Sequence, residues 1–430
     1  MTDDILFYNN NSNKMHDYVC HYCYLDNAAT TQMDIDVLTG LYHDYCYNAV
    51  GFGNPSSLHF VGTHARHTIN NHIGMLCEDY NKIIKNNNES NKELILNRTN
   101  FIFTSGGSES NNLAIKGIGK YLFKTKKKNH IITSKIEHPS ILNACKQLET
   151  EGFEVTYLSC DKKGKINLDE LKYSIKDNTA LVSTMYVNNE TGTENDIKSI
   201  FKMCVDNNVY FHTDAVQSTN APLFSVLPLY CHSFSLSGHK FGAMQGTGLL
   251  YVSNDLKLEP QIVGGHQQNG LRAGTENILG VCSIIRTLCF KTLIKDLDLS
   301  KWNNKTRLKC ELETLVNYIN QTNVKDYVIT TPKECFHNGI LNISFNNVEG
   351  ESLVLAMNKE YIYISSGSAC SAGSIEPSYV LTSMGYSDSV AKNAIRISLK
   401  KHYLYSDEQL QYIANTLVKC VNNIRRINGD

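Results

Sequence analysis

The chain has 430 residues, which is long enough for a large hydrophobic core and for more than one domain. Hydrophobic residues make up 42% of it and charged residues 19%, which is typical of a soluble globular protein. The 41 Lys and Arg residues balance 42 Asp and Glu residues, so the formal charge of −1 provides no electrostatic argument for nucleic acid or an anionic membrane as a main partner.

The cysteines and the N-terminal residues indicate a reducing compartment. Fourteen cysteines are scattered along a long chain that has no signal peptide, which disfavours a secreted disulfide framework. Cys20 and Cys23 have the spacing of half a zinc site, but no second pair follows, so we expect no metal. No apolar stretch approaches the ~18 residues of a membrane span. The acidic, Asn-rich start is unlike a transit peptide, and the cytoplasm is therefore the expected location.

Short β-branched runs alternate with segments of helical period along most of the chain. The expected strands lie at 101–103, 130–133, 180–183 and 209–211, and helical stretches lie between them, for example at 139–149 and 195–206. Strands spaced by helices indicate βα units and a mainly parallel sheet that is covered on both faces. The predicted fold class is therefore α/β.

A second region has its own strand signal at 340–345 and a helical C-terminal end, which indicates a smaller α+β domain. We expect three units along the chain. An N-terminal segment at 1–33 packs with the small domain, a large domain spans 34–297, and the small domain spans 298–430.

The first candidate site follows the strand at 101–103. In parallel sheets, ligands gather at the carboxyl ends of the strands and on helix N-termini. Here the run from Thr104 to Asn112 includes Gly107 and Ser108. Glycines let the backbone approach an anion, and free amides with serine hydroxyls can hold a phosphate. An ordinary strand–turn–helix with a serine N-cap is the alternative.

Further polar residues fall at the ends of later strands. His138 could stack on a planar cofactor or move a proton, although it could equally cap a helix. Asn189 ends a third strand. Asp214 ends a fourth, as a helix cap or as the partner of a pyridinium nitrogen. Lys240 follows an apolar segment, and its amine could bond covalently to an aldehyde cofactor. Successive strand ends thus offer the parts of one cofactor site.

One cysteine lies in an unusual setting. Cys370 is flanked by small residues throughout 365–377, and few of these could pack into a core. Such a segment suits a loop that presents a reactive thiol, although a free cysteine is most often a small buried hydrophobic residue.

As a set, these motifs resemble the NifS/IscS type of cysteine desulfurase, a pyridoxal-phosphate enzyme of the class V aminotransferase group. The resemblance implies fold type I, a mainly parallel seven-stranded sheet flanked by helices. It extends from about Tyr24 to Ser398 and rests on Tyr24 to Thr31, Gly53 to His59, Thr104 to Asn112, Glu137-His138, Asn188 to Glu190, Ser237 to Lys240, Gly264 to Gln267, Arg272 to Asn277 and the Cys370 loop.

The resemblance also implies roles for individual residues. Lys240 would bind pyridoxal 5'-phosphate covalently and act as acid and base, His138 would stack on its ring, and Asp214 would pair with the ring nitrogen. Asn189 and Arg396 would hold the substrate carboxylate by bidentate pairing. The other cofactor contacts would come from Gly107, Ser108, Asn189, Gln217, Ser237, His239 and, from the neighbouring subunit of a homodimer, Thr275.

The implied reaction converts L-cysteine to L-alanine. The Lys240 amine would move the α-proton, and the Cys370 thiolate would attack the substrate sulfur. Cys370 would then carry a persulfide to an acceptor protein for iron–sulfur cluster or thio-cofactor synthesis. The catalytic residues are thus expected to be Cys370, Lys240 and His138.

The chain departs from the family pattern at several places. Met244-Gln245 replaces the usual Pro-Lys, and Gln268 stands where Glu is usual. The chain ends without the Trp-containing tail by which iron–sulfur-assembly members dock a scaffold protein, since its single tryptophan is Trp302. Donation to that scaffold is therefore less firmly implied than the desulfurase chemistry.

Three alternatives remain open. The first is a selenocysteine lyase or another class V lyase, which would not need Cys370. The second is a non-catalytic scaffold, which predicts a degraded site, whereas Lys240, Asp214 and His138 are all present. The third is a nucleic-acid module, which only the run from Lys124 to Lys128 suggests and which a solvated face explains better.

Overall fold

The computed structural model describes residues 22–47, 52–87, 94–289, 304–366, 376–401 and 403–429. Its large sheet has seven strands in the order β2-β8-β7-β6-β5-β3-β4. The pairs from β4 to β7 are parallel, whereas β8 is antiparallel to β7 and to β2. The strands are β2 Phe101–Thr104, β3 His130–Ser134, β4 Glu154–Leu158, β5 Thr179–Ser183, β6 Tyr210–Asp214, β7 Ser233–Ser237 and β8 Gly248–Val252. The expected α/β class with a mainly parallel seven-stranded sheet is confirmed.

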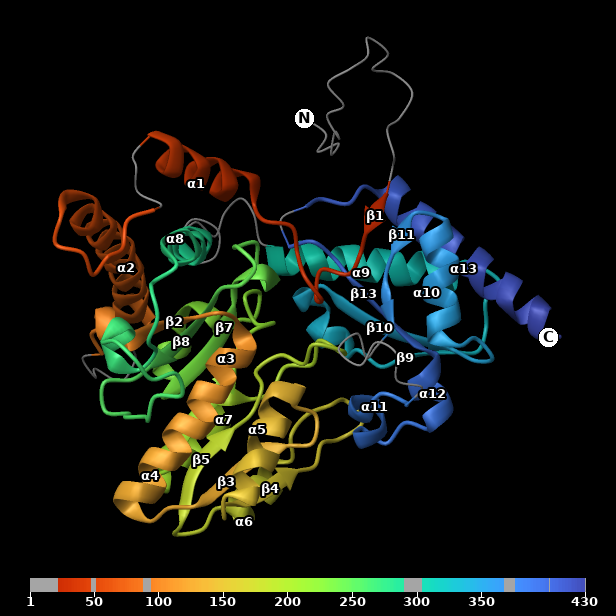
Figure 1. The fold of residues 1–430 in the computed structure, drawn as a ribbon. Coiled ribbons are helices and arrows are strands. Elements are labelled where there is room, and N and C mark those ends of the chain that lie inside the picture. Colours follow the sequence, from red (N-terminus) through yellow and green to blue (C-terminus); the bar gives the residue numbers. More distant parts are fainter. Residues whose placement is uncertain are drawn as a thin grey trace.

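Helices cover both faces of this sheet (Figure 1). Successive strand residues point to opposite faces, so Ile102 packs with one hydrophobic cluster while Phe101 and Phe103 pack with another. Both clusters are buried, which explains the near-continuous apolar runs of these strands. The first face carries α4 Ile118–Lys126 and α5 Pro139–Thr150, and the second carries α2 Phe60–Asn87, α6 Leu168–Ser174, α7 Ile197–Asp206 and α8 Ile278–Thr287.

The C-terminal part of the chain forms a second, smaller sheet with its own helices. It contains a four-stranded sheet in the order β12-β13-β10-β9, in which all pairs are antiparallel. Its core is a separate hydrophobic cluster formed largely by the sheet and the helices packed on it. The elements are α9 Asn304–Asn320, β9 Tyr327–Ile329, β10 Ile340–Phe345, α10 Gly350–Lys359, β11 Ile362–Tyr363, β12 Ser365–Ser366, α11 Tyr379–Ser383, α12 Asp388–Asn393, β13 Ala394–Ser398 and α13 Asp407–Asn428.

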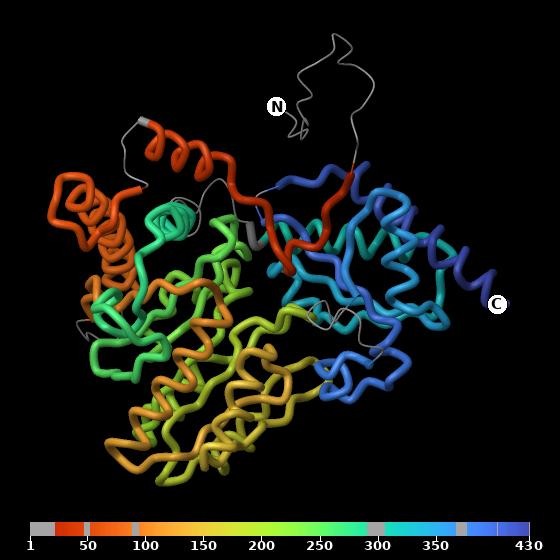
Figure 2. The backbone as a smooth tube through the Cα atoms, in the orientation of Figure 1, coloured from red at the N-terminus to blue at the C-terminus, as the bar shows by residue number. Residues whose placement is uncertain are grey.

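The N-terminal segment connects the two sheets. Strand β1, Cys23–Tyr24, pairs in parallel with β11, and Asp26 forms an isolated bridge with Ser398 at the end of β13. The chain then runs toward the large sheet (Figure 2). There the amide of Thr31 donates to the carbonyl of His239. The predicted unit limits 1–33, 34–297 and 298–430 remain a prediction, since the boundary near 298 lies outside the described residues.

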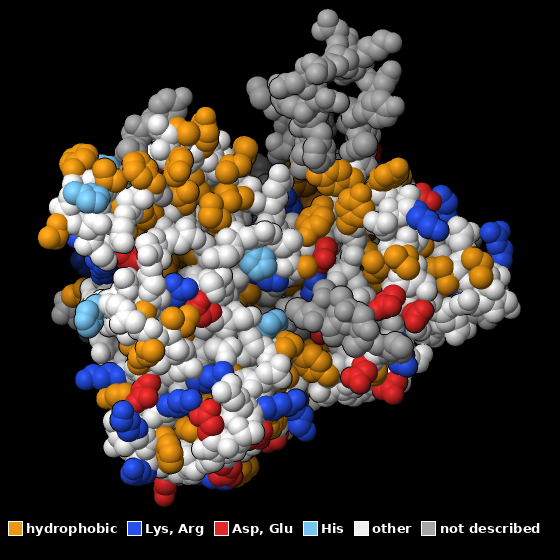
Figure 3. Space-filling view, in the orientation of Figure 1, with side chains coloured by type: hydrophobic (Ala, Val, Ile, Leu, Met, Phe, Trp, Pro, Cys, Tyr) orange, Lys and Arg blue, Asp and Glu red, His pale blue; other side chains and the backbone are white. Residues whose placement is uncertain are grey.

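Apolar side chains gather on one surface, over α1 and the start of α2 (Figure 3). Helix α1, Ile35–Tyr47, contributes several of them, and its residue Ile35 is 68% exposed. Leu58 and Phe60, which precede and begin α2, are 92% and 81% exposed. Patches of exposed apolar side chains are typical of interaction sites. The members of this patch are Ile35, Leu38, Tyr42, Tyr45, Phe52, Leu58 and Phe60.

The described part of the chain holds no helix with the length and hydropathy needed to cross a membrane. Within the same residues, no group of three or more His, Cys, Asp or Glu side chains could hold a metal ion.

Candidate active site

Asp214 lies at the carboxyl end of β6 and is 5% exposed. Its Oδ1 accepts a hydrogen bond from the amide of Val216 at 2.9 Å, and its Oδ2 accepts one from Asn111 Nδ2 at 2.7 Å. These two N–H donors fix the orientation of the buried carboxyl group. The Asp214 side chain is thereby held at the edge of the sheet.

His138 is the N-cap of α5, and its Nδ1 accepts a hydrogen bond from the amide of Ser140 at 3.1 Å. A ring nitrogen that accepts from an amide carries no proton, so the proton of the neutral imidazole lies on Nε2. Asn111 Nδ2 also reaches Ser140 Oγ at 3.0 Å. The capping role and the site role considered for His138 are therefore compatible, and Asn111 connects it to Asp214.

Lys240 ends a short 3-10 helix, Gly238–Lys240, directly after β7. Its Nζ donates hydrogen bonds to the carbonyls of Ala28 at 2.8 Å and Ala29 at 2.6 Å. Gln217 Nε2 donates to the same Ala28 carbonyl at 2.8 Å. Carbonyl groups of the N-terminal segment thus bind two residues of the predicted cofactor site. The sequence had placed this segment in a family motif but had implied no role for it.

The predicted phosphate turn lies at the start of α3, Gly107–Asn112, where β2 ends. A Cβ on Gly107 would lie 2.9 Å from Val216 Cγ2 and 3.2 Å from Ser237 Cβ, so only glycine lets these segments approach this closely. Ser108 is exposed, and its hydroxyl is open to a ligand. The chemistry of amides and hydroxyls at a helix start fits a phosphate.

His239 is another of the predicted phosphate-binding residues, and it follows Ser237 by two positions in the sequence. Its Nδ1 lies 3.0 Å from Thr30 Oγ1. Burial, together with the positive charge of Lys240, lowers the pKa of His239 to about 4. The imidazole is therefore neutral at physiological pH and would bind an anion through a hydrogen bond rather than through charge.

Glu109 supports the turn from outside. Its carboxylate forms an ion pair with Arg272 at 2.9 Å and accepts a hydrogen bond from the amide of Ser105 at 2.8 Å. Burial opposes its ionisation, but the hydrogen bonds from Arg272 and Ser105 dominate and lower its pKa. The ionised Glu109 thus ties the turn to the loop before α8.

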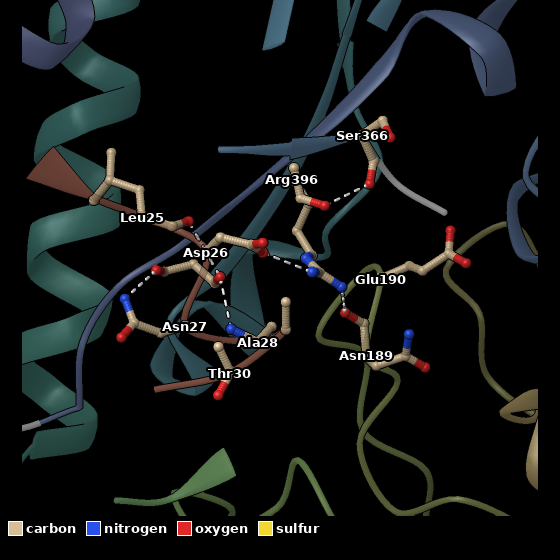
Figure 4. Close-up of polar contacts among 12 residues, drawn as sticks. Leu25, Asp26, Asn27, Ala28, Thr30, Asn189, Glu190, Ser366 and Arg396 are labelled. Atoms are coloured by element: carbon tan, nitrogen blue, oxygen red, sulfur yellow. Dashed lines mark hydrogen bonds and ion pairs between the residues drawn. The ribbon is translucent and has the colours of Figure 1, made fainter. Parts of the chain in front are cut away.

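Arg396 lies in β13 of the small sheet, and its side chain is 2% exposed. Its Nη1 donates to the backbone carbonyl of Asn189 at 2.9 Å, and its Nη2 forms an ion pair with Asp26 Oδ1 at 2.8 Å (Figure 4). Among the described residues its Nε has no hydrogen-bond partner. The predicted pair of Asn189 and Arg396 is brought together, but through the main chain of Asn189.

Two buried acids near the site were not anticipated from the sequence. Burial raises the pKa of Glu137 to about 8, against hydrogen bonds from Ser134 and Met185. Burial raises the pKa of Glu190 to about 7, against the Ser378 hydroxyl and the charge of Arg396. Both are members of motifs on which the family resemblance rests, but nothing local signals that their carboxyl groups are buried.

For two predicted site residues, the described part of the chain gives no contact with this cluster. Cys370 lies within 367–375, outside the described residues. Thr275 is exposed in the loop before α8, and no contact found in the described part of the chain links it to the cluster.

Comparison with known proteins agrees with this arrangement. The profile of the family described as Aminotransferase class-V matches residues 23–410. A cysteine desulfurase of Nostoc sp. is 37% identical over 407 residues, which cover 94% of each chain. The cysteine desulfurase IscS of Methanosarcina thermophila is 36% identical and covers 94% of this chain and 93% of the relative.

Solved structures show the same likeness. A NifS-like protein superposes with a TM-score of 0.79 at 29% identity, covering 94% of this chain and 99% of the other. The structure named SspA in complex with cysteine has a TM-score of 0.70 at 29% identity, covering 89% and 100%. The chain therefore belongs to the class V aminotransferases, and within them to the cysteine desulfurases. The enzymes of this family depend on pyridoxal phosphate. The predicted cysteine desulfurase activity is confirmed.

Proposed function

We propose that this chain holds pyridoxal 5'-phosphate at the carboxyl ends of β6 and β7 and there removes the sulfur of L-cysteine. The observation that carries the proposal is the buried Asp214 carboxylate, which hydrogen bonds from Asn111 and Val216 hold in place at the edge of the sheet. Lys240 follows the adjacent strand, and β6 and β7 are paired up to Asp214. When bound, the cofactor supplies an electron sink for the bonds at the substrate Cα.

Different residues would bind different parts of the cofactor. Asp214 would pair with the ring nitrogen, and His138 would stack on the ring. Gln217 would contact the ring oxygen. The phosphate would be bound by Gly107, Ser108, Ser237, His239 and, from a second subunit, Thr275.

Substrate recognition and proton transfer would use other residues. Arg396 binds the carboxylate of L-cysteine, with Asn189 fixing the guanidinium through its carbonyl. Lys240 removes the proton from the substrate Cα, and its contacts with the Ala28 and Ala29 carbonyls keep the amine at the site. Proximity of a positioned amine to the Cα proton is the main requirement of this step.

Sulfur transfer would depend on Cys370. Its thiolate attacks the substrate sulfur, so that an S–S bond forms and the bond between Cβ and sulfur breaks. The electron pair of that bond stays on Cβ, which takes up a proton, and Lys240 returns a proton to Cα, so that L-alanine leaves. Cys370 keeps the sulfur as a persulfide for a sulfur-acceptor protein of iron–sulfur cluster or thio-cofactor synthesis.

Two measurements test this proposal. Purified protein incubated with pyridoxal phosphate should gain the absorbance band of a lysine-bound cofactor, and Lys240→Ala should lack it. Incubation with L-cysteine should give a persulfide that mass spectrometry maps to Cys370, and Cys370→Ala should release no sulfur. Undiminished sulfur release by Cys370→Ala would instead support a lyase that needs no thiol, such as a selenocysteine lyase.

The second subunit is supported by the exposed apolar patch around α1, which a homodimer interface would cover (Figure 3). Thr275 is exposed in a loop of the same domain, where it could enter a partner's phosphate site. Light scattering should give twice the chain mass, and Leu58→Asp should shift the protein toward the monomer and weaken cofactor binding.

A cytoplasmic location is also part of the proposal. Every cysteine in the described part of the chain carries a free thiol, which fits a reducing compartment. Cell fractionation with compartment markers would test it.

A further inference from the structure

Along one edge of the Arg396 guanidinium, only one of the two nitrogens has a hydrogen-bond partner among the described residues. Nε and Nη2 form one edge of the group, and a carboxylate can bind both atoms at once. In the structure Asp26 Oδ1 occupies Nη2 at 2.8 Å, while Nε is buried and has no hydrogen-bond partner among the described residues. Asp26 therefore supplies the charge that Arg396 needs but makes only one of two available contacts.

The backbone of Asp26 is fixed on both sides. The amide of Leu25 donates to the Tyr363 carbonyl at 2.8 Å, and the amide of Ser398 donates to the Leu25 carbonyl at 2.7 Å. Asn27 Nδ2 donates to the Ser398 carbonyl at 2.9 Å. Because β11 and β13 hold this segment, Asp26 can leave Arg396 only by rotation of its side chain, which is 21% exposed.

The other nearby acid is already engaged. Ser378 Oγ donates to Glu190 Oε2 at 2.5 Å, and Figure 4 shows the Glu190 carboxyl group directed away from the guanidinium. Asp26 is thus the carboxylate that faces Arg396 directly.

We propose that Asp26 is an internal occupant of the substrate-carboxylate site, and that the α-carboxylate of the substrate displaces it from Arg396. The incoming carboxylate gains both Nη2 and Nε, whereas Asp26 holds Nη2 alone. The Asp26 side chain neutralises the buried guanidinium when no substrate is bound and returns when the product leaves. Asp26 is therefore a positioning residue that sets the affinity for carboxylate ligands. This inference rests on the proposed role of Arg396.

The test compares variants of the cofactor-loaded enzyme by titration calorimetry with propionate, a carboxylate that has no amine. Asp26→Asn keeps the size of the side chain and removes its charge. Its dissociation constant for propionate should fall about tenfold, which corresponds to ~1.4 kcal/mol. The KM for L-cysteine should fall in parallel with little change in kcat. Asp26→Glu, which keeps the charge, should bind propionate as weakly as the natural protein.

The outcomes separate this inference from the proposed function. Unchanged or weaker propionate binding by Asp26→Asn overturns the inference. Arg396→Gln should lose propionate binding altogether, and if it does not, the proposed role of Arg396 fails instead. If Asp26→Asn does not fold, a crystal structure of the natural protein with L-alanine decides the matter. The alanine carboxylate should contact both Nε and Nη2 with Asp26 turned away, and an intact contact between Asp26 and Arg396 would refute the displacement.

Discussion

Asn111 Nδ2 donates a hydrogen bond to Asp214 Oδ2 over 2.7 Å, although 103 residues separate the two in sequence. The same amide reaches Ser140 Oγ, which lies 2.8 Å from His138 Nδ1. One buried side chain thus orients both residues that would contact the cofactor ring.

The first prediction concerns this amide. Asn111→Leu removes a donor from a buried carboxylate, and a hydrogen bond to a charged group contributes about 1.5–3 kcal/mol. The affinity for pyridoxal phosphate, measured by equilibrium dialysis, should fall by at least about tenfold. Asn143→Leu changes an exposed asparagine of α5 in the same way and should leave the affinity unaltered. Equal affinities in both variants would show that Asn111 does not orient Asp214.

The second prediction concerns pH and Glu137, whose pKa burial raises from 4.5 to about 8. Between these values the unfolded chain loses the proton while the folded protein keeps it, so the free energy of unfolding should fall as pH rises. The loss is up to ~1.4 kcal/mol per pH unit in this window. In Glu137→Gln the side chain stays neutral, and denaturant titrations at several pH values should show a shallower decline.

A matched control is available for that substitution. Glu149 is exposed, so Glu149→Gln should reproduce the pH dependence of the natural protein. If Glu137→Gln and the natural protein decline equally with pH, Glu137 is ionised in the folded state and this prediction is wrong.

The third prediction concerns the close approach at Gly107. In Gly107→Ala the new Cβ would meet Val216 Cγ2 at 2.9 Å, and overpacking of this kind costs about 1–3 kcal/mol. We expect a lower melting temperature and weaker phosphate binding. Gly74 in α2 has no atom within 4 Å of an added Cβ, so Gly74→Ala should stabilise the helix by up to about 1 kcal/mol. Thermal unfolding of the two variants should therefore shift in opposite directions.

The fourth prediction concerns Gln268, whose side-chain amide forms hydrogen bonds through both its oxygen and its nitrogen. Its Oε1 accepts from the amide of Phe103 at 2.9 Å, and its Nε2 donates to Glu276 Oε1 at 2.6 Å. Gln268→Glu would place two carboxylates together, which should cost about 1–3 kcal/mol at neutral pH. Acidification should recover part of this loss because one carboxyl group can then donate.

The comparison variant for Gln268 is Gln147→Glu. Gln147 Nε2 also donates to a glutamate, Glu151, but at an exposed position. Water screens the new charge there, so the change in melting temperature should be small. Similar losses in both variants would mean that burial does not matter at Gln268.

The predicted strand ends lie where the structure has them, because a mainly parallel sheet brings the carboxyl ends of its strands to one edge. Asp214 and Lys240 could be placed by this rule, since each lies within a few residues of the end of a predicted strand. His138 could be placed too, although the residue that aligns it could not. Asn111 lies in α3, near the end of the polar run from Thr104 to Asn112, where its neighbours gave no sign that it would be buried.

The sequence by itself determined the alternation of strands and helices, the chemistry available at each strand end and the family, because these depend on local pattern and residue type. The tertiary structure alone decided which groups meet. It placed Asp26 on Arg396 across 370 residues, turned the Asn189 carbonyl toward the same guanidinium, and buried Glu137 and Glu190. These contacts depend on how segments distant in sequence pack in three dimensions, and no local periodicity encodes them.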